Sequence, residues 1–80
     1  MIEVPCVVLV GGQTYVEKLI FNNSSSLTEM GDKVYSQYND YTAYVALVDD
    51  QPTGQVDIFY QEVNPDWMSD LEKILRDNLE

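Results

Sequence analysis

The chain has 80 residues, of which 14 are Asp or Glu and four are Lys or Arg, so its formal net charge is −10 at pH 7. A protein this acidic repels nucleic acids and anionic membranes, and it attracts basic surfaces of other proteins. The lack of histidine and the single cysteine, Cys6, exclude histidine-based catalysis and a disulfide within the chain. A hydrophobic share of 45% is typical of folded proteins, so we expect residues 1–80 to form a single domain.

The first half of the chain predicts a β-hairpin followed by a helix. Residues 2–10 are rich in Val, Ile and Leu, and a Gly-Gly-Gln turn leads into a second β-like segment at residues 14–21. Because both alternating faces of the first segment are apolar, we expect its later part to be a central strand. After a polar loop, Ser26 and Glu29 have the spacing of a capping box, which predicts a helix that ends near Asn39.

The second half predicts another hairpin and another helix. Residues 41–48 alternate as a strand, residues 49–54 are dense in turn-forming residues, and residues 55–63 are predicted as the fourth strand. An Asn-Pro-Asp run then favours a helix start, which predicts a last helix from about residue 65 to residue 78. The chain is therefore predicted as an α+β fold of order ββαββα, with a four-stranded, mostly antiparallel sheet and two helices packed on one face.

The register expected for the second hairpin places an aromatic pair on the helix-free face of the sheet. If Val48 pairs with Gln55, then Tyr44 lies opposite Phe59, with Asp57 beside them. Aromatic side chains anchor interfaces and carboxylates bind arginine, so this group is a candidate protein-binding patch. An equally good interpretation is a cross-strand pair that only stabilises the sheet or packs in a homodimer.

Negative charge is concentrated in the second half of the chain. Residues 49–80 contain nine acids and two bases, a net charge of −7, whereas residues 1–48 contain five acids and two bases, a net charge of −3. Lys73 and Arg76 neutralise part of the last helix, so the acids of the second hairpin are expected to be the least compensated. The residues predicted to contact a partner are the acids of this half and the aromatic pair: Asp49, Asp50, Asp57, Glu62, Asp66, Asp70, Asp77, Tyr44 and Phe59.

The sequence contains no catalytic or cofactor-binding motif. Without histidine, Cys6 has no base to activate it, and no pair of carboxylates is marked as converging in a cleft. Zinc-type and calcium-loop spacings are missing, so we expect no metal site, no cofactor and no enzymatic activity. Six tyrosines suit base stacking, but without a basic groove we expect no direct binding of nucleic acid.

The first residues indicate a cytoplasmic protein. They carry no basic segment of the signal-peptide type, and their apolar stretch ends at Gly11 and Gly12, far short of a membrane span. We therefore expect no membrane partner.

Small size, acidity and the lack of a catalytic motif make the chain similar to the small acidic inhibitors that phages direct against host nucleases, restriction systems and CRISPR systems. This resemblance implies an anti-defence protein, of the anti-CRISPR type, that acts in the host cytoplasm; some such inhibitors mimic the charge of DNA. We expect the chain to cover a basic, nucleic-acid-binding site on a partner protein. Two alternatives stay open: an immunity protein or antitoxin that neutralises a basic toxin, and a structural subunit that forms a homo-oligomer.

Overall fold

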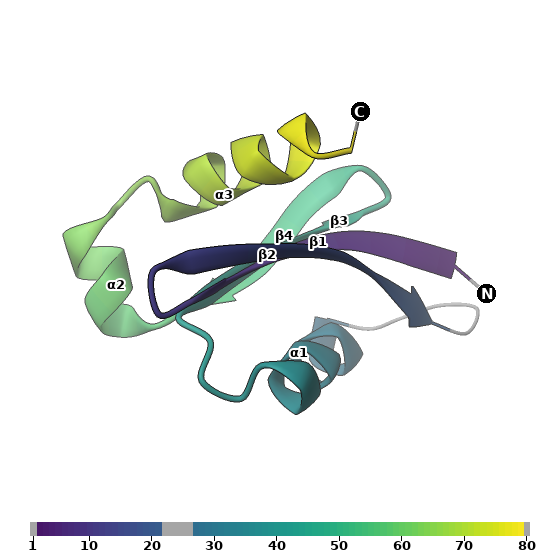
Figure 1. Ribbon diagram of the computed structural model, residues 1–80, viewed down its shortest axis with the longest axis horizontal. Helices are drawn as coiled ribbons and strands as arrows, with labels where there is room; N and C mark the ends of the chain where they lie inside the picture. The colour runs from purple at the N-terminus through teal and green to yellow at the C-terminus, as the bar shows by residue number, and fades with distance from the viewer. Residues whose placement is uncertain (1, 22–26, 80) are drawn as a thin grey trace.

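The computed structural model describes residues 2–21 and 27–79, and these residues form one antiparallel sheet of four strands and three helices (Figure 1). The elements follow one another as β1 (Ile2–Val10), β2 (Gln13–Phe21), α1 (Leu27–Gln37), β3 (Ala43–Val48), β4 (Gln51–Val56), α2 (Ile58–Val63) and α3 (Trp67–Asp77). Across the sheet the strand order is β2-β1-β3-β4. The predicted α+β class and antiparallel sheet are confirmed, whereas α2 is a helix that the predicted order lacks.

The first hairpin forms as predicted. β1 and β2 pair over their whole length, with Ile2 opposite Phe21 at the open end. Gly11 and Gly12 make the turn with φ angles of 56° and 83°, a left-handed conformation that glycine adopts without steric cost. β1 also pairs with β3, so it is a central strand, as its two apolar faces indicated.

The second hairpin has a tighter turn than predicted. Asp49 and Asp50 form a two-residue turn with φ angles of 52° and 64°, so Val48 pairs with Gln51 and not with Gln55. Aspartate tolerates this left-handed conformation better than most residues do. The following turn-forming residues are therefore free to extend the edge strand β4, where a proline is tolerated.

The segment predicted as the fourth strand, residues 55–63, is divided between the end of β4 and helix α2. Tyr44 lies opposite Gln55, so its predicted pairing with Phe59 is wrong. Asp57 begins the helix, because its carboxylate accepts a hydrogen bond of 2.9 Å from the N–H of Phe59. A short apolar run fits a strand or a helix by its pattern alone, and here the capping aspartate favours the helix.

The bounds of the two longer helices lie close to the predicted ones. α1 ends two residues before Asn39, while the proposed capping residue Ser26 and the loop at residues 22–26 lie outside the described residues. α3 begins at Trp67, two residues later than predicted, and is preceded by a turn in which the N–H of Asp66 donates to Asn64 Oδ1 at 3.2 Å.

The longer helices cover opposite faces of the sheet, contrary to the prediction that they share one face (Figure 1). The cluster on the α1 side consists of Val4, Cys6, Val8, Leu19, Phe21, Met30, Val34, Tyr44 and Ala46. The cluster on the α3 side consists of Val7, Leu9, Ala43, Val45, Leu47, Trp67, Leu71 and Leu75. Because the central strands β1 and β3 are apolar on both faces, one layer of helices cannot shield them from water.

Candidate functional site

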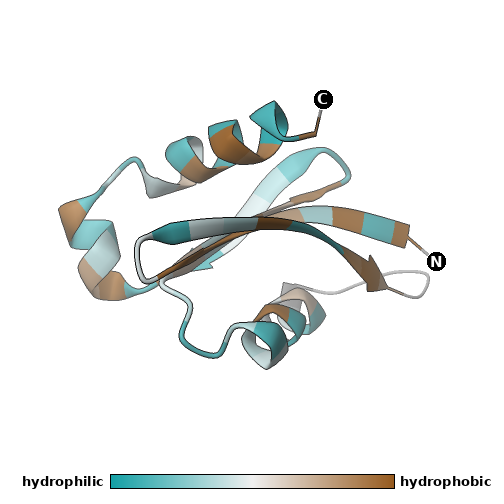
Figure 2. Cartoon of the chain, in the orientation of Figure 1, coloured by the Kyte–Doolittle hydropathy of each residue, from teal (hydrophilic) through white to brown (hydrophobic). Residues whose placement is uncertain are grey.

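Helix α2 presents apolar side chains to solvent. It contains no buried residue, and Ile58, Phe59 and Val63 are 64%, 74% and 81% exposed, the three highest values among the large hydrophobic residues of the described structure. The hydropathy colouring shows hydrophobic segments at both ends of this short helix (Figure 2). Apolar groups that gather at one place on a small protein mark an interaction site, whereas single exposed ones need no explanation.

Tyr60 and Asn64 hold α2 to the rest of the domain. The Tyr60 side chain packs against the cluster on the α3 side, and its hydroxyl accepts a hydrogen bond of 3.1 Å from Asn64 Nδ2. The same amide nitrogen lies 3.4 Å from Asp70 Oδ2 on α3. With about 100° between successive helical residues, Ile58 and Glu62 lie roughly opposite Tyr60 around α2, Phe59 lies about 100° from it and Val63 about 60° from it.

The charges next to these apolar residues are all negative. Asp57 precedes α2, Glu62 lies on it and Asp66 follows it, and all three are exposed. Residues 34–72 contain no lysine or arginine, so no neighbour in the sequence neutralises these acids. We call Ile58, Phe59 and Val63, together with Asp57, Glu62 and Asp66, the α2 surface.

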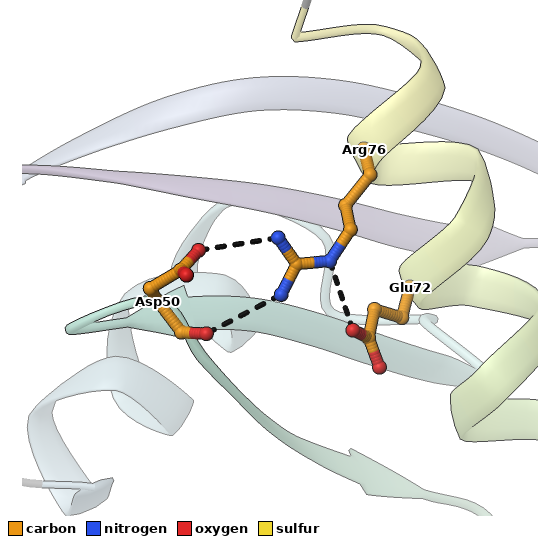
Figure 3. Close-up of polar contacts among 3 residues, drawn as sticks. All are labelled: Asp50, Glu72 and Arg76. Carbon is orange, nitrogen blue, oxygen red and sulfur yellow. Dashed lines mark hydrogen bonds and ion pairs between the residues drawn. The ribbon is translucent and has the colours of Figure 1, made fainter.

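A second group of predicted contact residues lies at the turn between β3 and β4, where Arg76 of α3 binds Asp50. The guanidinium donates to Asp50 Oδ1 at 3.1 Å, to the Asp50 carbonyl oxygen at 3.3 Å and to Glu72 Oε2 at 2.9 Å (Figure 3). The hydrogen bonds with Glu72 and Asp50 raise the pKa of Arg76 above its ordinary value. Asp50 is thus compensated within the molecule, contrary to the prediction for the acids of this hairpin.

The predicted contact residues therefore separate into two groups at opposite ends of the molecule (Figure 1). Near α2 lie Asp57, Phe59, Glu62, Asp66 and Asp70. Near the β3–β4 turn and the end of α3 lie Asp49, Asp50 and Asp77. Tyr44 belongs to neither group, because it is 5% exposed in the core beneath α1 and not on an open face as predicted.

Two apolar members of the α2 surface, Ile58 and Val63, are missing from the predicted set. Both were predicted within a fourth strand over residues 55–63, and neither was assigned to the contact surface. The signal that identifies them is local: Asp57 and Asn64 bracket a six-residue segment with the side chains that favour helix ends.

Among the described residues, no group of three or more His, Cys, Asp or Glu is placed to hold a metal ion. Cys6 is fully buried, and burial, with a smaller contribution from Glu17, raises the pKa of its thiol to about 12. The thiol is therefore protonated at neutral pH and is not a nucleophile. No helix in the described part of the chain is long and apolar enough to cross a membrane.

Comparisons with protein-family models, with curated proteins and with solved structures find no match to this chain.

Proposed function

We propose that this chain is a small acidic binding protein that uses its α2 surface to cover a basic site on another protein. One observation carries the proposal: the three most exposed large hydrophobic residues, Ile58, Phe59 and Val63, lie on one short helix whose neighbouring charges are all negative. A nucleic-acid-binding site is the basic surface that fits best, because it gathers Arg and Lys in one place. The chain would then inhibit its partner by competing with DNA or RNA.

The two kinds of side chain on the α2 surface have different roles in this proposal. Phe59 and its apolar neighbours supply the desolvated centre of the interface, where most of the binding free energy arises. Asp57, Glu62 and Asp66 steer the chain toward a basic partner and then pair with its Arg and Lys side chains at the rim. Binding of this kind should be fast at low salt and should weaken as the salt concentration rises.

An inhibitor of this kind suits a phage anti-defence protein of the anti-CRISPR type that acts in the host cytoplasm. The same surface would also serve an immunity protein or antitoxin that neutralises a basic toxin. A competition experiment distinguishes the anti-defence inhibitor from the immunity protein or antitoxin. DNA or RNA displaces the chain from its partner only where the covered site is the one that binds nucleic acid.

The proposal is tested by measuring binding of the immobilised chain to a panel of purified basic DNA- and RNA-binding proteins, with acidic proteins of similar size as the reference set. We expect saturable binding to members of the basic set, with an affinity that falls between 50 and 500 mM NaCl. Phe59→Ala should weaken this binding about 30-fold, because it removes a central anchor. The variant should fold normally, since Phe59 is 74% exposed.

Charge reversal at two places on the molecule tests whether binding depends on where the acids lie or only on the net charge. Glu62→Lys with Asp66→Lys and Asp32→Lys with Asp77→Lys raise the net charge by the same four units, the first pair at the α2 surface and the second pair away from it. We expect the first pair to slow association about tenfold and the second to have little effect. Equal effects of the two pairs, or no saturable binding to the basic set, would contradict the proposal.

Self-association through strand β2 is the second candidate. β2 is a nine-residue edge strand, and its outward residues Val16 and Ile20 are 38% and 48% exposed, whereas the other edge strand contains Pro52. A long edge strand without proline offers unpaired backbone groups to a second copy. Sedimentation velocity separates the candidates: a dimer that Ile20→Thr dissociates and Phe59→Ala does not would favour the homo-oligomer.

A further inference from the structure

A hollow of about 250 Å³ lies next to the α2 surface. It is open to solvent and is bordered by α1, the connection from α1 to β3, the end of β4 and the start of α2. Its polar lining consists of Tyr35, Asn39, Tyr41, Thr42, Gln55 and Asp57. Asp57 belongs both to this lining and to the α2 surface, so the hollow and the exposed apolar residues meet at one carboxylate.

The lining offers hydrogen-bond acceptors and carries a negative charge. Each of its polar side chains contains an oxygen atom, and none is a lysine or arginine. Asp57 Oδ1 accepts the N–H of Phe59, which leaves the second carboxylate oxygen for a ligand. Five of the six polar side chains carry donors as well as acceptors, and Asp57 supplies the one formal charge of the lining, so a cationic group with several donors matches it better than an anion does.

Two tyrosines line the hollow, one exposed and one held by contacts with its neighbours. Tyr35 is 61% exposed, so its ring is available to a ligand. Tyr41 is fixed by an edge contact with the ring of Tyr44, with 5.5 Å between ring centres, and its hydroxyl donates to Gln55 Oε1 at 3.2 Å. A hollow lined by both an exposed ring and a carboxylate suits a guanidinium group, which stacks on an aromatic face while its N–H groups bind a carboxylate.

We propose that this hollow binds one arginine side chain of the partner protein. The inference rests on the proposed function and adds the chemistry of one contact to it. The guanidinium stacks on Tyr35 and donates to Asp57, while the adjacent surface of the partner packs on Phe59. Arginine fits better than lysine, because an ammonium group is a compact point charge that cannot stack on a ring in this way.

The test is an NMR titration of the isotope-labelled chain with N-acetyl-arginine methylamide, and with the neutral citrulline analogue as the control ligand. We expect saturable shifts at Tyr35, Tyr41 and Asp57 with the arginine compound, with a dissociation constant in the millimolar range, and no saturable shifts with the citrulline compound. Asp57→Asn should weaken binding about tenfold, because it removes the charge that the guanidinium binds. Asparagine caps a helix as well as aspartate does, so α2 should persist in this variant.

Three further variants test the role of the Tyr35 ring and the position of the negative charge. Tyr35→Phe should keep the affinity and Tyr35→Ala should lose it, because the ring and not the hydroxyl stacks on the ligand. Asp49→Asn removes the same charge at the far end of the molecule and should change nothing. Equal binding of the arginine and citrulline compounds, or an Asp57→Asn variant that binds as tightly as the wild type, would overturn the inference.

The inference and the proposed function can fail separately. If Phe59→Ala abolishes binding to a basic protein while Tyr35→Ala, which changes the hollow alone, leaves it unchanged, the α2 surface binds the partner and the hollow does not. If the arginine compound binds at the hollow and no basic protein binds the chain, the hollow is a site and the proposed function is wrong.

Discussion

Asp49 and Asp50 carry the same charge in the same two-residue turn but have different surroundings. Both have positive φ angles, 52° and 64°, in a region that asparagine and glycine occupy more readily than aspartate at these turn positions. Asp50 gains the contacts with Arg76, whereas the described structure records no hydrogen bond or ion pair for the Asp49 side chain. The cost of the turn conformation is therefore offset at one position and not at the other.

This difference predicts different melting temperatures for two equivalent substitutions. Asp49→Asn should raise the melting temperature by a few degrees, because asparagine suits the first position of this turn and one repelling charge is removed. The Asp50→Asn variant should melt at a lower temperature than Asp49→Asn, because it weakens the exposed ion pair with Arg76. Thermal melts of the two variants and the wild type provide the measurement, and equal melting temperatures for the two variants would contradict it.

The sequence identifies Asp57, Phe59 and Glu62 as candidate contact residues, but it does not identify the geometry that unites them. They were expected on a sheet beside Tyr44, and the structure places them on a helix while Tyr44 packs in the core. The cause is a four-residue change of register: with Val48 opposite Gln51 in place of Gln55, β4 reaches the first residue of β3 at Val56, and residues 57–63 have no partner on β3. Whether two aspartates form a tight turn or begin a longer loop depends on the packing of β4, which the local sequence does not encode.

Two glycines illustrate how the elements of this fold fit together. Gly31 lies within α1, and a methyl group added there would stand 3.5 Å from Tyr44 Oη and 3.6 Å from Gln55 Oε1, both ordinary contact distances. Gly54 lies in β4, and a methyl group added there would overlap the backbone carbonyl oxygen of Tyr44 on the paired strand. The helix therefore has room for a side chain at its glycine, and the edge strand does not.

The same chemical change should consequently have opposite effects at these positions. Gly31→Ala should stabilise the protein by about 1 kcal/mol, because alanine favours the helix interior. Gly54→Ala should destabilise it by roughly 3 kcal/mol, because the β3–β4 pairing must shift to make room. Urea denaturation of both variants measures the free energy of unfolding, and a tolerated Gly54→Ala would contradict the close approach of β4 to β3.

A helix or strand could be predicted correctly where the residues that determine it lie close together in the sequence. The first hairpin, with Gly11 and Gly12 between two apolar runs, and the end of α1 are correctly predicted because their turn and helix signals are contained in a few residues. α2 is missed because a six-residue apolar segment fits either periodicity. The placement of α1 and α3 on opposite faces depends on contacts between distant segments, although the two-sided apolar pattern of β1 contained an indication of it.

The charge of the whole molecule opposes its compact fold. Fourteen acids and four bases give a net charge of −10 on 80 residues, and the described ion pairs involve Glu3, Asp50 and Glu72, all with exposed or partly exposed side chains. Exposed pairs of this kind contribute little to stability, so they offset only a small part of the repulsion that the net charge creates.

We therefore expect the melting temperature to rise as NaCl increases from 20 to 500 mM. The reason is that salt screens the repulsion among carboxylates more than it weakens the few attractive pairs. The Glu62→Lys and Asp66→Lys double variant, which is less negative, should show a smaller increase than the wild type. A melting temperature that falls with added salt would show that the attractive pairs dominate instead.

The central claim is that a basic protein partner is bound at the α2 end of the molecule and not at the β3–β4 turn or the β2 edge. Hydrogen–deuterium exchange of the chain, alone and in complex with the tightest-binding basic protein, tests it most directly. We expect slower exchange on binding at the amides of residues 57–66, with no change at residues 48–51 or 13–21. Protection at the turn or along β2, with residues 57–66 unchanged, would contradict the claim.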